Sequence, residues 1–205
     1  MLNTTHNCPQ CGSLLPLSFR YSKLAVCEHC SSTLFLEDAA VRLAGKASVL
    51  AAMPSLLQLR VPFSYQGKTY TPVGHVRYRY QDGCWDEWWV LDGADGCWVS
   101  VDEGDFAFEI PRPDWIHPFP DIRTAQVGQT VKRLTQSWEI TEKDLCTCEG
   151  VQGELPEHIL PGERMGYLHL SGPEGALVTL EYPFQGEPMA YEGRWVDPFE
   201  IRVAT

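Results

Sequence analysis

The sequence predicts a mostly β protein in which a small cysteine-containing unit precedes an antiparallel β-barrel-like or sandwich domain built on a four-stranded meander. Three observations support this prediction. Two Cys-x2-Cys pairs lie near the N-terminus, apolar and polar residues alternate after residue 69, and the chain contains 17 Gly and 15 Pro. Alternation with a period of two is typical of strands, and abundant Gly and Pro indicate many turns and few long helices.

The length of 205 residues allows a small unit and a medium-sized domain. Between them, an Ala-rich segment permits a helix but is interrupted by Gly45 and Pro54, so we expect a connector there. The predicted organisation is a zinc ribbon at residues 1–38, a connector at 39–62 and an all-β domain at 63–205, with the meander at 69–110 and a second half at 121–205.

The N-terminal cysteines follow the spacing Cys-x2-Cys-x15-Cys-x2-Cys, which strongly indicates a zinc ribbon. Two such pairs place four thiolates around one ion in a closed tetrahedral shell, so the expected zinc is structural. A unit of about 40 residues has little core, and metal binding would supply the missing stability. Two disulfides are the alternative, which we disfavour because the N-terminus lacks the features of a secretory signal. The expected zinc ligands are Cys8, Cys11, Cys27 and Cys30.

The charge of the chain bears on its partners. The net charge is −11, and residues 63–205 carry eleven Lys or Arg against twenty-four Asp or Glu, so this part would repel nucleic acid. Nucleic-acid binding through the ribbon would rest on Arg20 and Lys23 alone. No apolar run approaches the roughly 18 to 20 residues that span a bilayer. We therefore expect a cytoplasmic protein without direct membrane insertion or a nucleic-acid partner.

Turn sequences divide residues 69–110 into four expected strands. Asp82-Gly83 is a preferred dipeptide of a two-residue hairpin turn, and the segments DGADG and DEGD supply the next two turns. Together these turns predict a register in which one face stays apolar across all four strands. The predicted opposite pairs include Arg79 with Asp86, Trp89 with Val99, and Val99 with Phe108.

Two adjacent acids lie among tryptophans in the segment DGCWDEWWVL. Because neighbouring strand residues point to opposite faces, Asp86 and Glu87 cannot converge on one substrate as an acid–base pair. Glu87 falls on the apolar face between Trp85 and Trp89, where a carboxylate needs a hydrogen bond or a counter-charge. A bond to the Tyr78 hydroxyl, to backbone amides or to a basic residue is the structural interpretation. Binding of a cation is the functional one.

The reverse face of the meander carries a large aromatic surface. Arg77, Trp88 and Trp98 are the candidate anchors on this face for a partner, because tryptophan and arginine dominate protein interfaces. A surface of this kind is normally covered. We expect residues 121–205 to cover it, and a partner protein is the alternative.

Alternation returns in the second half of the chain. Strands are expected near residues 130–134, 138–140, 166–170, 176–182 and 193–196, with a loop at 148–156. Within this region Cys146 and Cys148 would share one face of a strand, where they serve either as small apolar residues or as a pair for a soft metal or a disulfide.

Several of these features together resemble a bacterial family known as domain of unknown function 4178, often preceded by a CxxC ribbon. The resemblance implies no catalytic residues. Genes of this family tend to lie near genes for polyamine-type synthases and membrane-stress proteins, so the resemblance implies a partner role. The matching features are the ribbon cysteines, the segments GKTY and VGHVRY, the block WDEW followed by Val90-Leu91, the Gly96–Gly104 hairpin and Gly150–Pro156.

We expect a non-enzymatic, zinc-binding adaptor or scaffold that acts through protein contacts in a bacterial assembly. The alternative is a binder of a small, polyamine-like cation, or an enzyme, that uses Glu87 in an aromatic pocket, because tryptophan and carboxylate together suit a cation.

Overall fold

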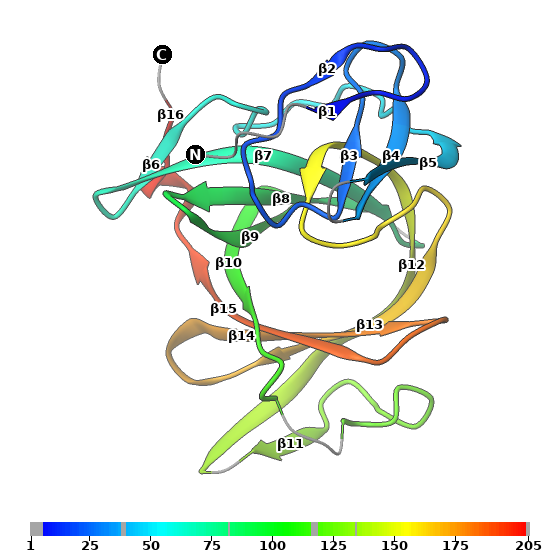
Figure 1. The fold of residues 1–205 in the computed structure, drawn as a ribbon. Helices are drawn as coiled ribbons and strands as arrows, with labels where there is room; N and C mark the ends of the chain where they lie inside the picture. Colours follow the sequence, from blue (N-terminus) through cyan, green and yellow to red (C-terminus); the bar gives the residue numbers. More distant parts are fainter. Residues whose placement is uncertain (1–5, 38–39, 82, 116–118, 134, 204–205) are drawn as a thin grey trace.

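The computed structural model describes residues 6–37, 40–81, 83–115, 119–133 and 135–203. These residues form strands β1 to β16 and two short 3-10 turns, Pro173–Gly175 and Pro198–Glu200 (Figure 1). The prediction of a mostly β protein is therefore confirmed. Among the described residues, no helix is long and apolar enough to cross a membrane.

Eight antiparallel strands pair side by side and close into a ring, as Figure 1 shows. Their order is β7, β8, β9, β10, β15, β14, β13 and β12, and β12 pairs again with β7. Closure leaves the ring without a free edge, and the predicted antiparallel, barrel-like domain is confirmed. The ring strands are β7 (Lys68–Arg79), β8 (Cys84–Asp92), β9 (Asp95–Asp102), β10 (Asp105–Pro111), β12 (Gln136–Leu155), β13 (Arg164–Ser171), β14 (Ala176–Pro183) and β15 (Met189–Val196).

The predicted meander is present as β7 to β10, but the β7–β8 register differs from the prediction. The backbone N–H of Tyr80 donates to the carbonyl of Gly83, so the turn lies one residue earlier than expected. From Cys84 to Trp89, each residue of β8 therefore lies opposite a β7 residue two positions earlier than predicted, and Arg77 rather than Arg79 faces Asp86. A shift of two residues keeps these side chains on their predicted faces, and a bulge between Pro72 and Gly74 adds one further residue for Val90 and Leu91.

The β8–β9 register differs by one residue, which has a larger effect. Gly93 and Ala94 alone separate the paired strand ends, so the turn is tighter than the five-residue turn that we expected. Trp89 therefore lies opposite Trp98 rather than Val99. Because the side-chain period of a strand is two, this shift exchanges the faces of β9 and turns Trp98 toward the inside of the ring. The predicted β9–β10 pairing of Val99 with Phe108 is confirmed.

The predicted loop at residues 148–156 is wrong, because most of it belongs to the long strand β12. Residues 147–153 pair with β7, with a bulge between Cys148 and Gly150. Gly153 has a φ of 70°, and a Cβ atom at this position would lie 2.1 Å from the carbonyl oxygen of Val73. The glycines that suggested a loop instead permit a bulge and a close approach of two strands.

Two layers cover the outside of the ring. Over β8 and β9, Leu57, Phe63 and Ile201 pack on Trp88 and Val90. Residues 121–205 therefore supply only part of the cover that we expected from them, since Leu57 and Phe63 precede the ring. On the opposite side, the segment after β10 and the start of β12 cover the outer faces of β13 and β14. The covering strands are β6 (Phe63–Tyr65), β11 (Thr130–Arg133) and β16 (Arg202–Val203).

The cysteine-containing unit joins the same sheet. Its strand β3 pairs with the end of β12, where Leu24 lies opposite Leu155 and Ala25 opposite Glu154. β5 lies within the range predicted as a connector and pairs with β4. The strands of this unit are β1 (His6–Asn7), β2 (Leu14–Leu15), β3 (Leu24–Val26), β4 (Ser32–Glu37) and β5 (Ala40–Ala47).

Candidate functional site: a cysteine cluster and an acidic lumen

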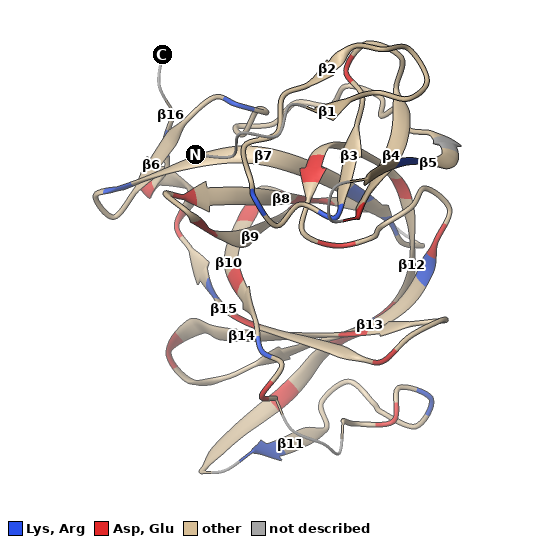
Figure 2. Ribbon diagram, in the orientation of Figure 1, with Lys and Arg blue, Asp and Glu red and all other residues tan. Residues whose placement is uncertain are grey.

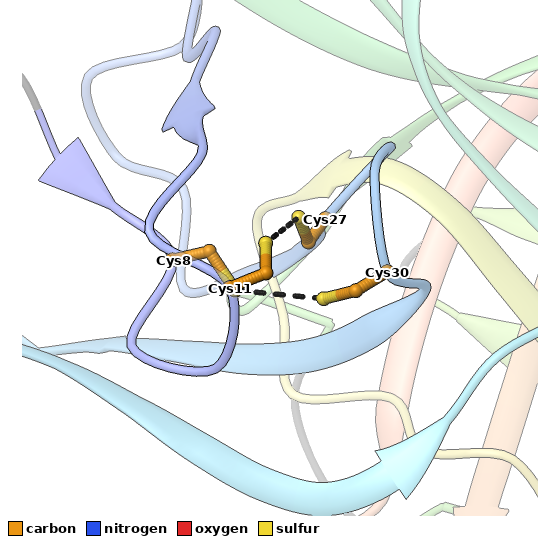
Figure 3. A group of neighbouring side chains, drawn as sticks. All are labelled: Cys8, Cys11, Cys27 and Cys30. Atoms are coloured by element: carbon orange, nitrogen blue, oxygen red, sulfur yellow. Dashed lines mark hydrogen bonds between the residues drawn. The ribbon is translucent and has the colours of Figure 1, made fainter.

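The four predicted ligand cysteines converge at one point (Figure 3). The sulfur atoms of Cys8 and Cys30 are 3.7 Å apart, those of Cys11 and Cys27 are 3.6 Å apart, and all four lie within 4.8 Å of one another. A tetrahedral site with metal–sulfur bonds of about 2.3 Å has sulfur–sulfur edges of about 3.8 Å. The cluster therefore has the size of a four-thiolate metal site, consistent with a zinc ribbon.

The turns that carry the cysteines are closed by backbone hydrogen bonds and favour the thiolate form of one ligand. The backbone N–H of Gly12 donates to the carbonyl of Cys8, and that of Ser31 donates to the carbonyl of Cys27. Contacts with Ser13 lower the pKa of the Cys11 thiol to about 6. A thiolate is the form that binds metal, so this contact favours the ligand state.

The candidate surface residues lie in the interior and do not form one surface. Arg77, Trp88 and Trp98 are 3%, 5% and 4% exposed. Trp88 packs outside the ring under the cover formed by Leu57 and Phe63, whereas Trp98 packs inside it against Trp89. The sheet therefore separates the two tryptophans that we predicted to share a face.

Asp86 is the centre of a buried polar cluster on the outside of the ring. Its carboxylate accepts hydrogen bonds from Arg77 at 2.7 and 3.1 Å and contacts the His75 Nε2 atom at 2.8 Å. Burial alone would raise the pKa of Asp86, but the bonds with His75 and Arg77 outweigh it and lower the pKa. Arg77 also donates to the carbonyl of Ala51, and the predicted Arg79 partner pairs with Glu149 instead. This cluster joins the connector to the ring.

Glu87 lies on the inside of the ring, opposite in direction to its neighbour Asp86, as the alternation predicts. Its carboxylate accepts a hydrogen bond from the indole N–H of Trp85 at 2.8 Å, and this bond replaces the expected one to Tyr78. Burial raises the pKa of Glu87 to about 8 despite that bond, and the charge of Glu109 adds to the increase.

Glu87 is one of six acids that line the lumen, by which we mean the interior of the ring. Acidic positions recur on strands around the ring in Figure 2. Two spaces share Glu87, Ser100, Glu109 and Thr179 as lining residues: one of about 380 Å³, which we call the wide chamber, and one of about 10 Å³, which we call the waist. The acids are Glu87, Asp102, Glu109 and Glu142 in the wide chamber, and Glu87, Glu109, Glu157 and Glu181 at the waist.

Two of these acids have strong neutral partners. Glu109 accepts hydrogen bonds from the hydroxyls of Ser100 at 2.7 Å and Thr179 at 2.6 Å. The Tyr191 hydroxyl donates to Glu157 at 3.0 Å, but burial still raises the pKa of Glu157. Burial and the charges of neighbouring acids place the pKa of Glu181 well above its ordinary value. Glu87, Glu157 and Glu181 therefore favour the protonated form unless a cation is present.

The rim of the wide chamber has a different balance. Glu142 contacts His169 Nδ1 at 2.8 Å and accepts a hydrogen bond from the Tyr167 hydroxyl at 2.5 Å. The bond with His169 is the main reason why the pKa of Glu142 is lowered. Burial raises the pKa of the nearby Asp102. Among the described lining residues of the wide chamber and the waist, His169 is the sole basic side chain.

The sequence contained a signal for the acids that we did not identify. Glu109 interrupts the apolar strand FAFEI, and Glu181 interrupts LVTLEY. An acid at an inward-facing strand position indicates a polar interior, and Glu109 and Glu181 indicate it as clearly as Glu87 does. Recognising that all three face one space required the pairing of β10 with β15, which joins residues far apart in the chain.

Two further cysteines, in the second half of the chain, lie in the wall of the lumen. Cys146 and Cys148 are both 1% exposed and pack among the aromatic side chains of the lumen wall. Burial raises the pKa of Cys146 above its ordinary range. A protonated, buried thiol has the character of a small apolar side chain.

Comparison with known proteins identifies the ring rather than the cysteine cluster. A family model described as a domain of unknown function (DUF4178) matches residues 61–198, which contain all eight ring strands. No curated protein and no solved structure matches the chain. Because the match spans well over half of the sequence, the chain belongs to the family of domain of unknown function 4178.

Proposed function

We propose that this protein binds a small organic cation in the lumen of its ring. The observation that carries the proposal is the grouping of six carboxyl groups within the lumen, where the described lining residues of the wide chamber and the waist include no Lys or Arg. Rings of eight strands have an interior just wide enough to be filled by side chains or to hold one small ligand. A cation would relieve the repulsion among these acids and compensate for their burial.

The walls of the lumen suit an organic cation. Trp85 and Trp98 line it beside the acids, and an aromatic face attracts a positive charge through its quadrupole. A bare metal ion suits the lumen less well, because it requires several oxygen ligands close together. Among the described residues, the four cysteines place their ligand atoms within 4.8 Å of one another, and the lumen acids form no such group of three or more.

This proposal takes precedence over the adaptor function that we also expected. The anchors of an adaptor surface, Trp88 and Trp98, are buried and lie on opposite faces of the sheet. A protein partner would have to bind elsewhere on the chain. The lumen acids, by contrast, favour a binding role, since an apolar interior would be more stable than one with repelling carboxyl groups.

For the cysteine cluster we propose a structural zinc ion held by Cys8, Cys11, Cys27 and Cys30. Four thiolates complete a tetrahedral shell and leave no position for a substrate. The reducing cytoplasm, where we expect the protein to reside, would keep these thiols free to bind metal. The zinc would stabilise the ribbon that packs at the end of the ring.

Titration calorimetry with spermidine tests the lumen proposal. At a pH of about 8.5 most of the Glu87 carboxyl groups are ionised, and we expect measurable binding heat with micromolar to millimolar affinity. The variant Glu87→Gln should weaken binding by about tenfold, which corresponds to about 1.4 kcal/mol. Glu103→Gln is the matched control, because Glu103 is exposed in the β9–β10 turn. Absence of heat at millimolar spermidine would contradict the proposal.

A further inference from the structure

The lumen is a series of three cavities rather than one compartment. The wide chamber and the waist share Glu87, Ser100, Glu109 and Thr179 as lining residues. Beyond the waist lies an outer chamber of about 640 Å³, bordered by the β12–β13 and β14–β15 loops. Because adjoining cavities share their lining side chains, the three follow one another through the ring.

The waist limits the shape of anything that passes from one chamber to the other. Its volume of about 10 Å³ is far smaller than that of the wide chamber or the outer chamber. A polymethylene chain is more slender than a ring or a trimethylammonium group, so it is the organic group that such a constriction admits most readily. The waist is also partly apolar, since Trp98 and Ile159 line it together with the acids.

Acids stand on both sides of this constriction. Asp102 and Glu142 line the wide chamber and not the waist. Glu157 and Glu181 line both the waist and the outer chamber. The outer chamber also contains Arg164 and His158. Acids are thus present at both ends, and the constriction between them carries the apolar side chains of Trp98 and Ile159 together with Glu87 and Glu109.

We infer that the lumen accepts a linear α,ω-diamine or longer polyamine, with its methylene chain in the waist and its ammonium groups in the chambers on either side. This inference rests on the proposed cation-binding function and narrows its substrate class. The ammonium group in the wide chamber would be bound by Asp102 and Glu142, and the other by Glu157 and Glu181. The methylene chain would contact Trp98 and Ile159, which are apolar side chains of the waist.

A series of amines tests the inference on the unmodified protein. Calorimetry would compare diamines from 1,3-diaminopropane to 1,8-diaminooctane with n-hexylamine and tetramethylammonium. We expect affinity to rise with diamine length until both ends reach their acids. The best diamine should bind at least about tenfold more tightly than n-hexylamine, because it adds a second charge-assisted contact. Tetramethylammonium should bind most weakly.

Variants on the two sides of the waist separate the two ends of the ligand. Glu142→Gln and Glu181→Gln should each weaken the best diamine by about tenfold. The monoamine n-hexylamine has one charged end and should respond to at most one of them. Ile159→Phe should narrow the waist and reduce diamine binding, while Ile159→Val should not. Glu103→Gln is the control for a change of charge, and thermal unfolding verifies that each variant is folded.

The outcomes separate this inference from the broader proposal. If tetramethylammonium or n-hexylamine binds as tightly as every diamine, threading through the waist is wrong and cation binding in the lumen stands. If affinity does not change with diamine length, threading is also wrong. If no amine binds, both the inference and the proposed function are wrong.

Discussion

The buried carboxylate of Glu154 accepts a hydrogen bond at 3.0 Å from the backbone N–H of Phe19, which precedes it by 135 residues. The same carboxylate accepts the N–H of Ser18 and the hydroxyl of Ser22, both at 2.7 Å. These bonds hold the loop between β2 and β3 of the ribbon against the ring, where the Phe19 ring lies 5.4 Å from that of Trp89. Glu154 therefore links the ribbon to the ring, in addition to the pairing of β3 with β12.

Replacing this acid should weaken the attachment of the ribbon. In Glu154→Gln an amide NH2 group, which cannot accept a hydrogen bond, replaces one of the two carboxylate oxygens. A hydrogen bond to a charged group contributes about 1.5 to 3 kcal/mol. We expect the free energy of unfolding to fall by about 2 kcal/mol, measured by chemical denaturation followed by tryptophan fluorescence. The control Glu103→Gln should change it by less than about 0.5 kcal/mol. Equal stability of both variants would show that Glu154 does not hold the ribbon.

Removal of the metal should release the same loop. We expect the purified protein to contain one equivalent of zinc, and Cys27→Ser to lose it, because three thiolates leave the shell incomplete. Metal analysis and limited proteolysis near residues 16–23 measure both effects. Cys84→Ser should retain the zinc, since Cys84 lies on β8 outside the cluster. Full zinc content in Cys27→Ser would exclude the proposed site.

The stability of the protein should depend on pH through Glu87. The pKa of Glu87 is raised from 4.5 to about 8, so between these values the folded protein holds a proton that the unfolded chain releases. Stability therefore falls as the pH rises through this window, by at most about 1.4 kcal/mol per pH unit for one group. Glu157 and Glu181 act in the same direction.

The variant Glu87→Gln should reduce this dependence. Denaturation midpoints measured from about pH 5 to 9 should fall less steeply in the variant, because a neutral amide has no proton to lose. Glu103→Gln should retain the slope of the unmodified protein. An unchanged slope in Glu87→Gln would assign the pH dependence to other groups.

Trp88 should act as a core residue. Its ring stacks on His75 with centroids 4.0 Å apart, and it is 5% exposed. Trp88→Ala should reduce the free energy of unfolding by about 3 to 5 kcal/mol, the range for truncating a large buried aromatic side chain. Phe199→Ala is the control, because Phe199 is 83% exposed. If the Trp88→Ala protein were stable but no longer bound a protein partner, the adaptor hypothesis would again be favoured.

Local patterns in the sequence were sufficient for several features. The spacing of Cys8, Cys11, Cys27 and Cys30 predicts the cluster, because each Cys-x2-Cys turn brings its own two thiols together. Alternation and turn residues predict the four-stranded meander, since each hairpin depends on neighbouring residues. The opposite directions of Asp86 and Glu87 follow from the strand period alone.

Other features were not determined by local patterns, and most of them depended on contacts between residues far apart in the chain. The direction of Trp98 depended on a one-residue difference in the β8–β9 turn, which the turn sequence did not reveal. The strand at 148–155 forms because β7 and β3 pair with it, although its glycines favour a loop locally. Glu87, Glu109 and Glu181 became one acidic site when β10 paired with β15 and β12 with β7. A strand pattern determines on which face a side chain lies, but closure of the ring decides which side chains share its interior.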